Sequence, residues 1–371
     1  MGIRPVSRIV LLILTAGLLA FAAGCGGNDE SSSTTPSTGT TGGSASLSGE
    51  IAGAGATSQQ AAQEAWIAGF QTANSGVTIA YDPVGSGGGR EQFVAGGTAY
   101  GGTDSALADE ELTGAQERCG GPDNLVEIPN YVSPIAVIYN LPDVTELKLN
   151  PDTLAKIFAQ KITKWNDPAI AATNQGVDLP DTDITPVNRS DESGTTENFT
   201  DYLSQAAPSV WTYEVSGDWP VKGGEAAEGT SGVVDAVTNG EGTIGYADAS
   251  QAGDLGKAEI QVGSEFVGPS PEAAAKIFDE SEKSDDPGAN VFTYKLNRTP
   301  DASDTYPIVL VSYLMGCTQY DDASTAAIVK AYFDYIISAE GQQVAAGAAG
   351  SAPLADSTRS QIQGAVDAIG G

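Results

Sequence analysis

Apolar and polar positions along this chain follow two different periods, which predict helices in some segments and strands in others. Ala62, Trp66 and Phe70 are spaced by four, as on one face of a helix. Helices are predicted for 59–70, 91–95, 152–158, 196–203 and 325–337. Strands are predicted for the alternating run 77–84 and for the apolar, β-rich runs 132–139 and 308–314. We expect the chain to change direction near Pro134 and Pro307. Alternating strands and helices predict α/β layers.

Three short segments share one chemical character, and each leads into a predicted helix. Residues 53–58, 85–89 and 189–196 are rich in glycine and hydroxyl side chains. Segments of this kind can point bare backbone N–H groups at an oxyanion. Thr103 and Asp104 add a carboxylate, which suits an anion only if the anion carries a proton. The combination therefore favours phosphate over sulfate.

The first 48 residues predict an exported, tethered protein. Arg4 and Arg8 precede apolar runs at 9–14 and 18–21, and the small residues 22–24 lead to Cys25. This pattern predicts a signal peptide at 1–24 and cleavage before a lipidated, palmitate-bearing Cys25; a transmembrane anchor is the alternative. Residues 25–48, largely Ser, Thr and Gly, then form a flexible tether with a reach of roughly 25–30 Å.

Composition limits the possible functions. The 371 residues are 40% hydrophobic and 18% charged, which suits a globular protein of two lobes. After removal of the leader, 15 basic residues face 48 acidic ones, a formal charge of −33. Such a surface repels nucleic acid and anionic lipid. An anion can still bind, because N–H groups and an arginine act at contact whereas net charge is screened over about 8–10 Å.

The chain contains no histidine, so it has neither a Ser–His–Asp triad nor an imidazole zinc site. The 85–90 loop lacks the Lys and Ser or Thr that end a nucleotide P-loop. We expect no metal, no cofactor and no catalysis, although composition does not exclude a phosphatase with acidic metal ligands. Cys119 and Cys317 form an even pair in an exported protein, which predicts a disulfide; two buried thiols are the alternative.

The chain resembles the PstS-type phosphate-binding proteins of bacterial phosphate ABC transporters. The matching positions lie at 53–57, 85–89 with Gln92 and Phe93, 103–104 with Leu107, 157–170, 189–196 and 240–246. The resemblance implies an α/β, two-lobed type II periplasmic-binding-protein fold with a ligand cleft between the lobes. It places lobe one at 49–132 and 309–371 and lobe two at 133–308, with crossings near 130–134 and 306–312.

The resemblance also implies a phosphate site. Its residues would be Thr57, Ser58, Ser86, Asp104, Arg189, Ser193, Gly194 and Thr195, with Asp191 holding the Arg189 guanidinium. Plainer roles remain open: a helix cap at Thr57 or Ser58, a flexible turn at Ser86, a surface ion pair at Arg189, and a cap by Asp104 for a helix at 106–112. Glu192 departs from the small residue common in the family and is tolerable only if it points to solvent. We expect structural roles for Lys156, Lys161, Lys164, Trp165, Trp211 and Trp219.

Together these features predict a monomeric, lipid-anchored receptor on the extracytoplasmic face of the membrane. It would close on inorganic phosphate and deliver it to the permease subunits of an ABC transporter. The alternatives are a receptor for another tetrahedral oxyanion, a phosphatase, and an adhesive surface protein.

Overall fold

The computed structural model describes residues 46–285 and 288–371. The predicted signal peptide, Cys25 and most of the predicted tether lie outside these residues. Residues Ser46–Gly371 form one compact unit. Among the described residues, no helix is long and apolar enough to cross a membrane.

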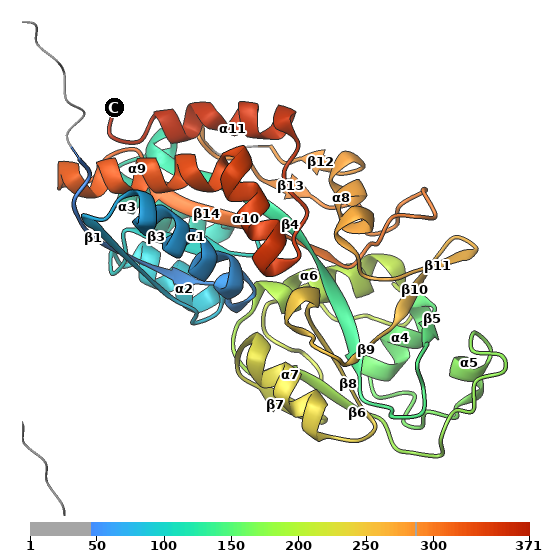
Figure 1. Ribbon diagram of the computed structural model, residues 1–371. Helices are drawn as coiled ribbons and strands as arrows, with labels where there is room; N and C mark the ends of the chain where they lie inside the picture. Colours follow the sequence, from blue (N-terminus) through green and yellow to red (C-terminus); the bar gives the residue numbers. More distant parts are fainter. Residues whose placement is uncertain (1–45, 286–287) are drawn as a thin grey trace, which may run out of the picture. The chain divides into compact units, whose positions relative to one another are not determined.

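A mixed, curled β-sheet forms the framework (Figure 1). Its strands, in sheet order, are β2 (Val77–Asp82), β1 (Gly49–Gly55), β3 (Tyr100–Thr103), β14 (Val309–Cys317), β4 (Leu125–Tyr139), β8 (Thr243–Asp248), β6 (Thr185–Arg189) and β7 (Glu225–Ala227), with β9 (Gly256–Lys257) also paired to β4. Strands β2, β1 and β3 are mutually parallel, as are β8, β6 and β7, whereas β14 and β4 run antiparallel to their neighbours. Small sheets join β11 (Glu265–Val267), β10 (Glu259–Val262) and β5 (Lys148–Leu149), and β12 (Glu282–Lys283) with β13 (Tyr294–Lys295).

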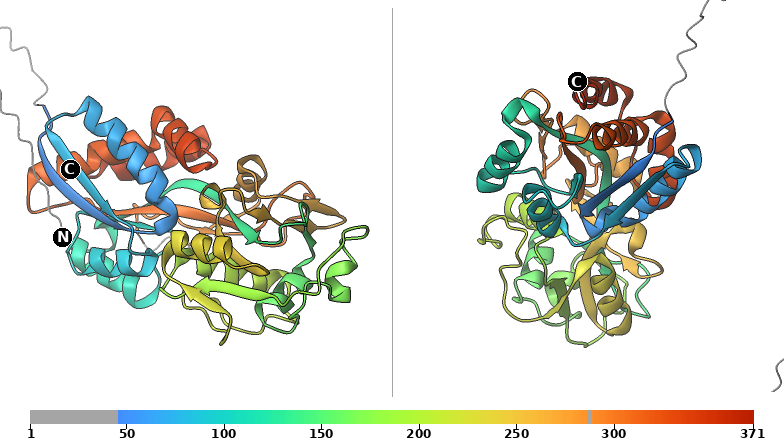
Figure 2. Two further views of the ribbon diagram at one scale, coloured as in Figure 1. Left: turned by 60° about the horizontal axis from the view of Figure 1, so that its bottom comes forward. Right: turned by 90° about the vertical axis from the view of Figure 1, so that its left-hand side faces the viewer.

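Two groups of helices cover this sheet and define two lobes. The helices of the first lobe are α1 (Gln60–Ala73), α2 (Ser86–Val94), α3 (Asp109–Cys119), α9 (Ala323–Ile337), α10 (Ala339–Ala349) and α11 (Asp356–Asp367). Those of the second lobe are α4 (Pro151–Phe158), α5 (Pro168–Ala171), α6 (Gly194–Ala206) and α7 (Gly229–Asn239), while α8 (Pro271–Asp279) packs against β4. Figure 2 shows the same division from two further directions, with blue and red elements on one side and green and yellow ones on the other.

Strand β4 connects the two lobes. Its first part pairs with β14 as far as Pro134, opposite Val309, and its last part pairs with β8 from Ile135, opposite Asp248. The expected change of direction at Pro134 is therefore wrong, because the strand continues and only its partner changes. Proline can occupy this position because its missing N–H falls where the ladder is interrupted.

Sequence periodicity located helices α1, α2, α4, α6 and α9 and strands β2, β4 and β14, but it misjudged several of their ends and did not predict the other elements. Strand β4 begins seven residues before the predicted strand, and α2 begins at Ser86, inside the glycine loop. Helices α10 and α11 were not predicted, since their many small residues give only a weak apolar stripe. Trp66 is buried under this C-terminal layer, and its indole Nε1 donates to the carbonyl oxygen of Gly341 at 2.7 Å.

Cys119 at the end of α3 and Cys317 at the end of β14 form a disulfide. The two residues are 198 positions apart in the sequence, and both belong to the first lobe. The bond therefore ties the start of that lobe to the strand that returns to it. The predicted pairing is confirmed.

Candidate functional site

The three segments rich in glycine and hydroxyls meet where strands of the two lobes end. In the first lobe β1 is followed by a 3₁₀ turn (Thr57–Gln59), β2 by α2, and β3 by Asp104. In the second lobe β6 ends at Arg189, and α6 begins at Gly194. Because the carboxyl ends of parallel strands gather at one edge, their loops converge on a common space.

Asp104 lies at the centre of this space and is only 2% exposed. Its Oδ2 accepts hydrogen bonds from the Ser58 hydroxyl at 2.5 Å and the Thr195 hydroxyl at 3.4 Å, and its Oδ1 accepts from the Ser312 hydroxyl at 3.0 Å. Burial raises the pKa of Asp104, while these hydroxyls and the nearby charge of Arg189 act in the opposite direction. The alternative role of Asp104 as a helix cap is wrong, because α3 begins at Asp109 with Ala108 before it.

Arg189 extends from the end of β6 and is 3% exposed. Its Nε donates to Oδ1 of Asp191 at 2.8 Å, and its Nη2 pairs with Oδ2 of the same carboxylate. Although burial raises the pKa of Asp191, the ion pair with Arg189 and the N–H of Gly229 bring it below its ordinary value. Since Asp191 uses one edge of the planar guanidinium, the other edge remains geometrically suited to an anion.

Close backbone approach in this region depends on two glycines. Gly85 has a φ of +89°, and a Cβ there would lie 2.7 Å from Oδ2 of Asp191. At Gly194 a Cβ would lie 2.7 Å from both the Asp104 Cβ and the Ser86 hydroxyl oxygen. The first turn of α6 thus packs directly against the first-lobe loops.

The Ser86 and Ser193 hydroxyls, like those of Ser58 and Thr195, bond within the protein. The Ser86 Oγ accepts from the backbone N–H of Asp104 at 3.2 Å, and the Ser193 Oγ caps α6 by accepting from the N–H of Thr196 at 3.3 Å. Both residues sit at helix N-termini, where several N–H groups lack intrahelical partners. Any anion held here would meet backbone donors as well as side chains.

Thr57 does not cap the helix that follows it, contrary to one of the expectations from the sequence. Its hydroxyl oxygen accepts from the backbone N–H of Thr230 at 3.1 Å and lies 2.9 Å from the Thr230 hydroxyl, at the start of α7. No side-chain cap is present at the start of the 3₁₀ turn or of α1. Thr57 therefore joins the first lobe to the second at one rim of the site.

Glu192 also differs from expectation. Its side chain is 42% exposed, yet the carboxylate pairs with Nη2 of Arg90 on α2. The expectation that it must point to solvent missed this neighbouring cation. Arg90 directly follows the predicted glycine loop at 85–89, so its charge was visible in the sequence but the direction of its side chain was not.

Sequence reasoning missed several supporting residues. Ser312 is the polar residue within an apolar strand, VLVSYLM, and that break in the pattern was an available signal. Gln251 was unpredictable: its amide donates to the carbonyls of Thr57 at 3.1 Å and Ser58 at 3.4 Å. Asp248, at the end of β8, is fully buried and accepts from the Ser133 hydroxyl at 2.5 Å. These contacts brace the loops where the lobes meet.

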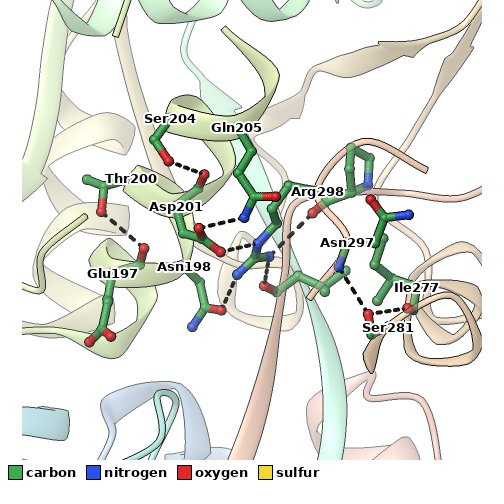
Figure 3. Close-up of polar contacts among 12 residues, drawn as sticks. Glu197, Asn198, Thr200, Asp201, Ser204, Gln205, Ile277, Ser281, Asn297 and Arg298 are labelled. Carbon is green, nitrogen blue, oxygen red and sulfur yellow. Dashed lines mark hydrogen bonds and ion pairs between the residues drawn. The ribbon is translucent and has the colours of Figure 1, made fainter. Parts of the chain in front are cut away.

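A buried arginine, Arg298, bonds to Asp201 and Asn198 of α6 (Figure 3). The guanidinium of Arg298 donates from Nε to Oδ2 of Asp201 at 2.7 Å, from Nη1 to the Val309 carbonyl at 2.7 Å, and from Nη2 to Oδ1 of Asn198 at 2.5 Å. Asn198 in turn donates to the backbone carbonyl of Asp104 at 2.7 Å. Arg298 thus connects α6 with β14 and, through Asn198, with the loop that carries Asp104.

Three of the residues assigned structural roles, Lys161, Lys164 and Trp165, make contacts within the protein. The Trp165 indole donates to the Gly242 carbonyl at 3.0 Å, and the Lys161 ammonium donates to the Val210 carbonyl at 3.0 Å. Lys164 pairs with Asp181 and Asp183 at the surface. Among the described residues, no group of three or more Cys, Asp or Glu side chains is placed to hold a metal ion.

Comparison with known proteins identifies the family. The model of the PBP superfamily domain matches residues 35–340. The phosphate-binding protein PstS 3 of Mycobacterium leprae is 35% identical over 379 aligned residues, which cover all of both chains. The chain belongs to the PstS family of phosphate-binding proteins. PstS 3 of Mycobacterium tuberculosis is also 35% identical, over 96% of this chain and 97% of that protein, and PstS of Pasteurella multocida is 33% identical, over 77% and 80%.

Solved structures show the same fold for this PstS chain. A high-affinity periplasmic phosphate-binding protein with bound phosphate superposes with a TM-score of 0.71 at 24% identity, over 85% of this chain and 93% of that one. A phosphate-binding protein from Stenotrophomonas maltophilia gives a TM-score of 0.68 at 20% identity, over 85% and 94%. The two-lobed periplasmic-binding-protein fold predicted from the sequence is confirmed.

Proposed function

We propose that this protein is an extracytoplasmic receptor that closes two lobes on inorganic phosphate and delivers it to the permease of an ABC transporter. It acts as a monomer, without cofactor, and performs no chemistry on its ligand. The proposal is supported by the names of the relatives described above, which are phosphate-binding proteins, and by the shared fold. The observation that carries it is the environment of Asp104.

Asp104 provides a reason for choosing phosphate. A buried carboxylate has no donor of its own, so it attracts an oxyanion only if that oxyanion brings a proton. Near neutral pH phosphate keeps at least one proton and can donate it to Asp104, whereas sulfate is fully ionised. The Ser58 and Thr195 hydroxyls, now directed at the carboxylate, can rotate toward the other oxygens of the anion.

The remaining predicted residues would supply the positive part of the cage. The free edge of the Arg189 guanidinium can donate to two oxygens, and Asp191 holds it in that orientation. Backbone N–H groups at the starts of α2 and α6, from Ser86, Gly194 and Thr195, and from the turn at Thr57 and Ser58, complete it. Ser193 contributes by capping α6 and so fixing the direction of that turn.

We propose lobe boundaries that follow from the crossing strands. Residues 49–132 and 309–371 form lobe one, and 133–308 form lobe two. In support, β4 changes its partner from β14 to β8 between Pro134 and Ile135. Bending at this point would move Arg189 and α6 away from Asp104 without breaking either ladder.

We also propose that Cys25 carries the lipid anchor, with 25–48 as a tether to the membrane. The small residues before Cys25 and the Ser/Thr/Gly-rich segment after it support this assignment. The formal charge of −33 on the mature chain would keep the folded part off an anionic membrane surface.

Calorimetric titration of the intact protein, after removal of bound ligand, tests the proposed function. Phosphate and arsenate, both protonated tetrahedral anions, should bind, and sulfate should not. Equal binding of sulfate would favour a general oxyanion receptor. Turnover of a phosphomonoester would instead indicate a phosphatase. Attachment to cells or matrix, in the absence of phosphate binding, would indicate an adhesive protein.

A further inference from the structure

The buried guanidinium of Arg90 on α2 is held mainly by its own lobe. It is 3% exposed. Its Nε donates to Oε1 of Glu111 on α3 at 2.9 Å, and its Nη1 donates to the hydroxyls of Thr103 at 3.0 Å and Ser105 at 2.9 Å. Burial alone lowers the pKa of Arg90, but the surrounding carboxylates raise it above its ordinary value. The permanently charged guanidinium of Arg90 therefore lies beside the site, and the N–H groups named above donate to protein partners.

One partner of Arg90 comes from the other lobe. Glu192 belongs to the loop between β6 and α6, and its carboxylate pairs with Nη2 of Arg90. A Cβ placed on Gly87 would lie 2.2 Å from Oε2 of Glu192, so this carboxylate also rests against the first turn of α2. There the helix dipole favours a negative charge. Like the Thr57–Thr230 contact, the Arg90–Glu192 contact joins the two lobes.

From this geometry we infer that Glu192 is a positioning residue for ligand binding: its ion pair with Arg90 holds the lobes closed and slows the release of phosphate. The inference rests on the proposed function. Glu192 would touch no ligand atom. It would act through the closed arrangement of the loop that also carries Arg189 and Asp191.

The two carboxylates that pair with Arg90, those of Glu111 and Glu192, belong to different lobes. When the lobes separate, Glu111, Thr103 and Ser105 stay with the arginine, whereas Glu192 leaves with α6. The Arg90–Glu192 pair therefore stabilises only the closed state. A contact made only there changes the dissociation rate more than the association rate. It also leaves the choice between phosphate and sulfate unchanged, because that choice depends on Asp104.

The test uses Glu192→Gln with Glu111→Gln as its matched control. Both changes remove one negative charge from the same guanidinium, and the two side chains have similar exposure, 42% and 39%. Any general effect of net charge on phosphate association is therefore equal in the two variants. Rapid filtration with radiolabelled phosphate gives both rate constants, and calorimetry gives the affinity, at low and at high ionic strength.

For Glu192→Gln we expect a dissociation rate about tenfold higher than that of the parent, equivalent to about 1.4 kcal/mol. The association rate should match that of Glu111→Gln, whose affinity should stay within about twofold of the parent. The affinity of the parent should fall more with added salt than that of Glu192→Gln, since a half-exposed pair is partly screened. Sulfate should remain excluded by all three proteins.

Equal dissociation rates for the two variants, or a parent-like rate for Glu192→Gln, would overturn the inference while leaving phosphate binding intact. A parent that does not bind phosphate would overturn the proposed function, and this inference with it. The unfolding temperatures of the ligand-free variants should agree, and a selective loss for Glu192→Gln would point to a structural role instead.

Discussion

Replacing Asp104 by asparagine should change the selectivity of the site more than its affinity for phosphate. The carboxylate is 2% exposed, so no water is available to separate it from a bound anion. An ionised carboxylate has no proton to donate, so no rotation of the Asp104 side chain presents a donor to sulfate. Sulfate would place lone pairs against lone pairs in a desolvated site.

The size of the effect follows from that clash. Sites built around one required hydrogen bond reject an analogue by about 10⁴–10⁵-fold, which corresponds to about 5.5–7 kcal/mol. In Asp104→Asn the clash disappears and the amide can donate, so sulfate affinity should rise by at least about 100-fold. For phosphate, the charged carboxylate acceptor is replaced by the neutral amide oxygen of asparagine, so the affinity for phosphate should fall by about tenfold.

Calorimetric titration of Asp104→Asn with phosphate and with sulfate measures both effects. Ser312→Ala is the control, because it removes the donor 3.0 Å from Oδ1 and leaves the carboxylate in place. That variant should bind phosphate more weakly than the parent and should still exclude sulfate. If Asp104→Asn excludes sulfate as strongly as the parent does, the selective role assigned to this carboxylate is wrong.

Four further predictions concern other parts of the chain. Arg189→Ala should lose several kcal/mol of phosphate binding and Arg189→Lys should fail as well, since one ammonium cannot replace a planar fork; near-native calorimetric affinity in both would move the site elsewhere. Burial raises the pKa of Asp248 to about 6, so the folded state keeps a proton that the unfolded state releases above pH 4. Stability should therefore fall by about 3 kcal/mol as the pH rises from about 4 to 6, and urea unfolding of Asp248→Asn should lack that part of the slope; an unchanged slope would exclude Asp248 as its source. Reduction of the Cys119–Cys317 bond, which closes a loop of 198 positions, should lower the unfolding free energy by up to about 5 kcal/mol, and identical denaturation curves with and without reductant would contradict this. Mass spectrometry of the membrane fraction should find acyl chains on Cys25, and a mature protein with unmodified Cys25 released into the medium would exclude the anchor.

The sequence could predict which segments form the candidate site, because the signal is chemical and local. Glycines and hydroxyls ahead of a helix can present backbone N–H groups to an anion wherever they lie in the chain. Asp104 stood out as a carboxylate among such segments. The structure brings these segments together around Asp104. Their contacts with phosphate stay a prediction.

What the sequence could not predict depends on the meeting of the two lobes. Thr57 is an adequate helix cap on local grounds, and only the position of α7 shows that its hydroxyl binds Thr230 instead. Glu192 looked unfavourable beside an anion until Arg90, about 100 positions earlier in the chain, proved to be its partner. Pairings between distant segments leave no periodic trace, so periodicity located several of the elements but none of the contacts between them.

The most direct test of the account is a crystal structure of the protein with phosphate bound, at a resolution that places each ligand oxygen. One phosphate oxygen should lie about 2.5–2.7 Å from a carboxylate oxygen of Asp104, and Arg189 should donate to the ligand through the edge of its guanidinium that faces away from Asp191. A phosphate held outside these loops, or held within them with Asp104 turned away, would contradict the account.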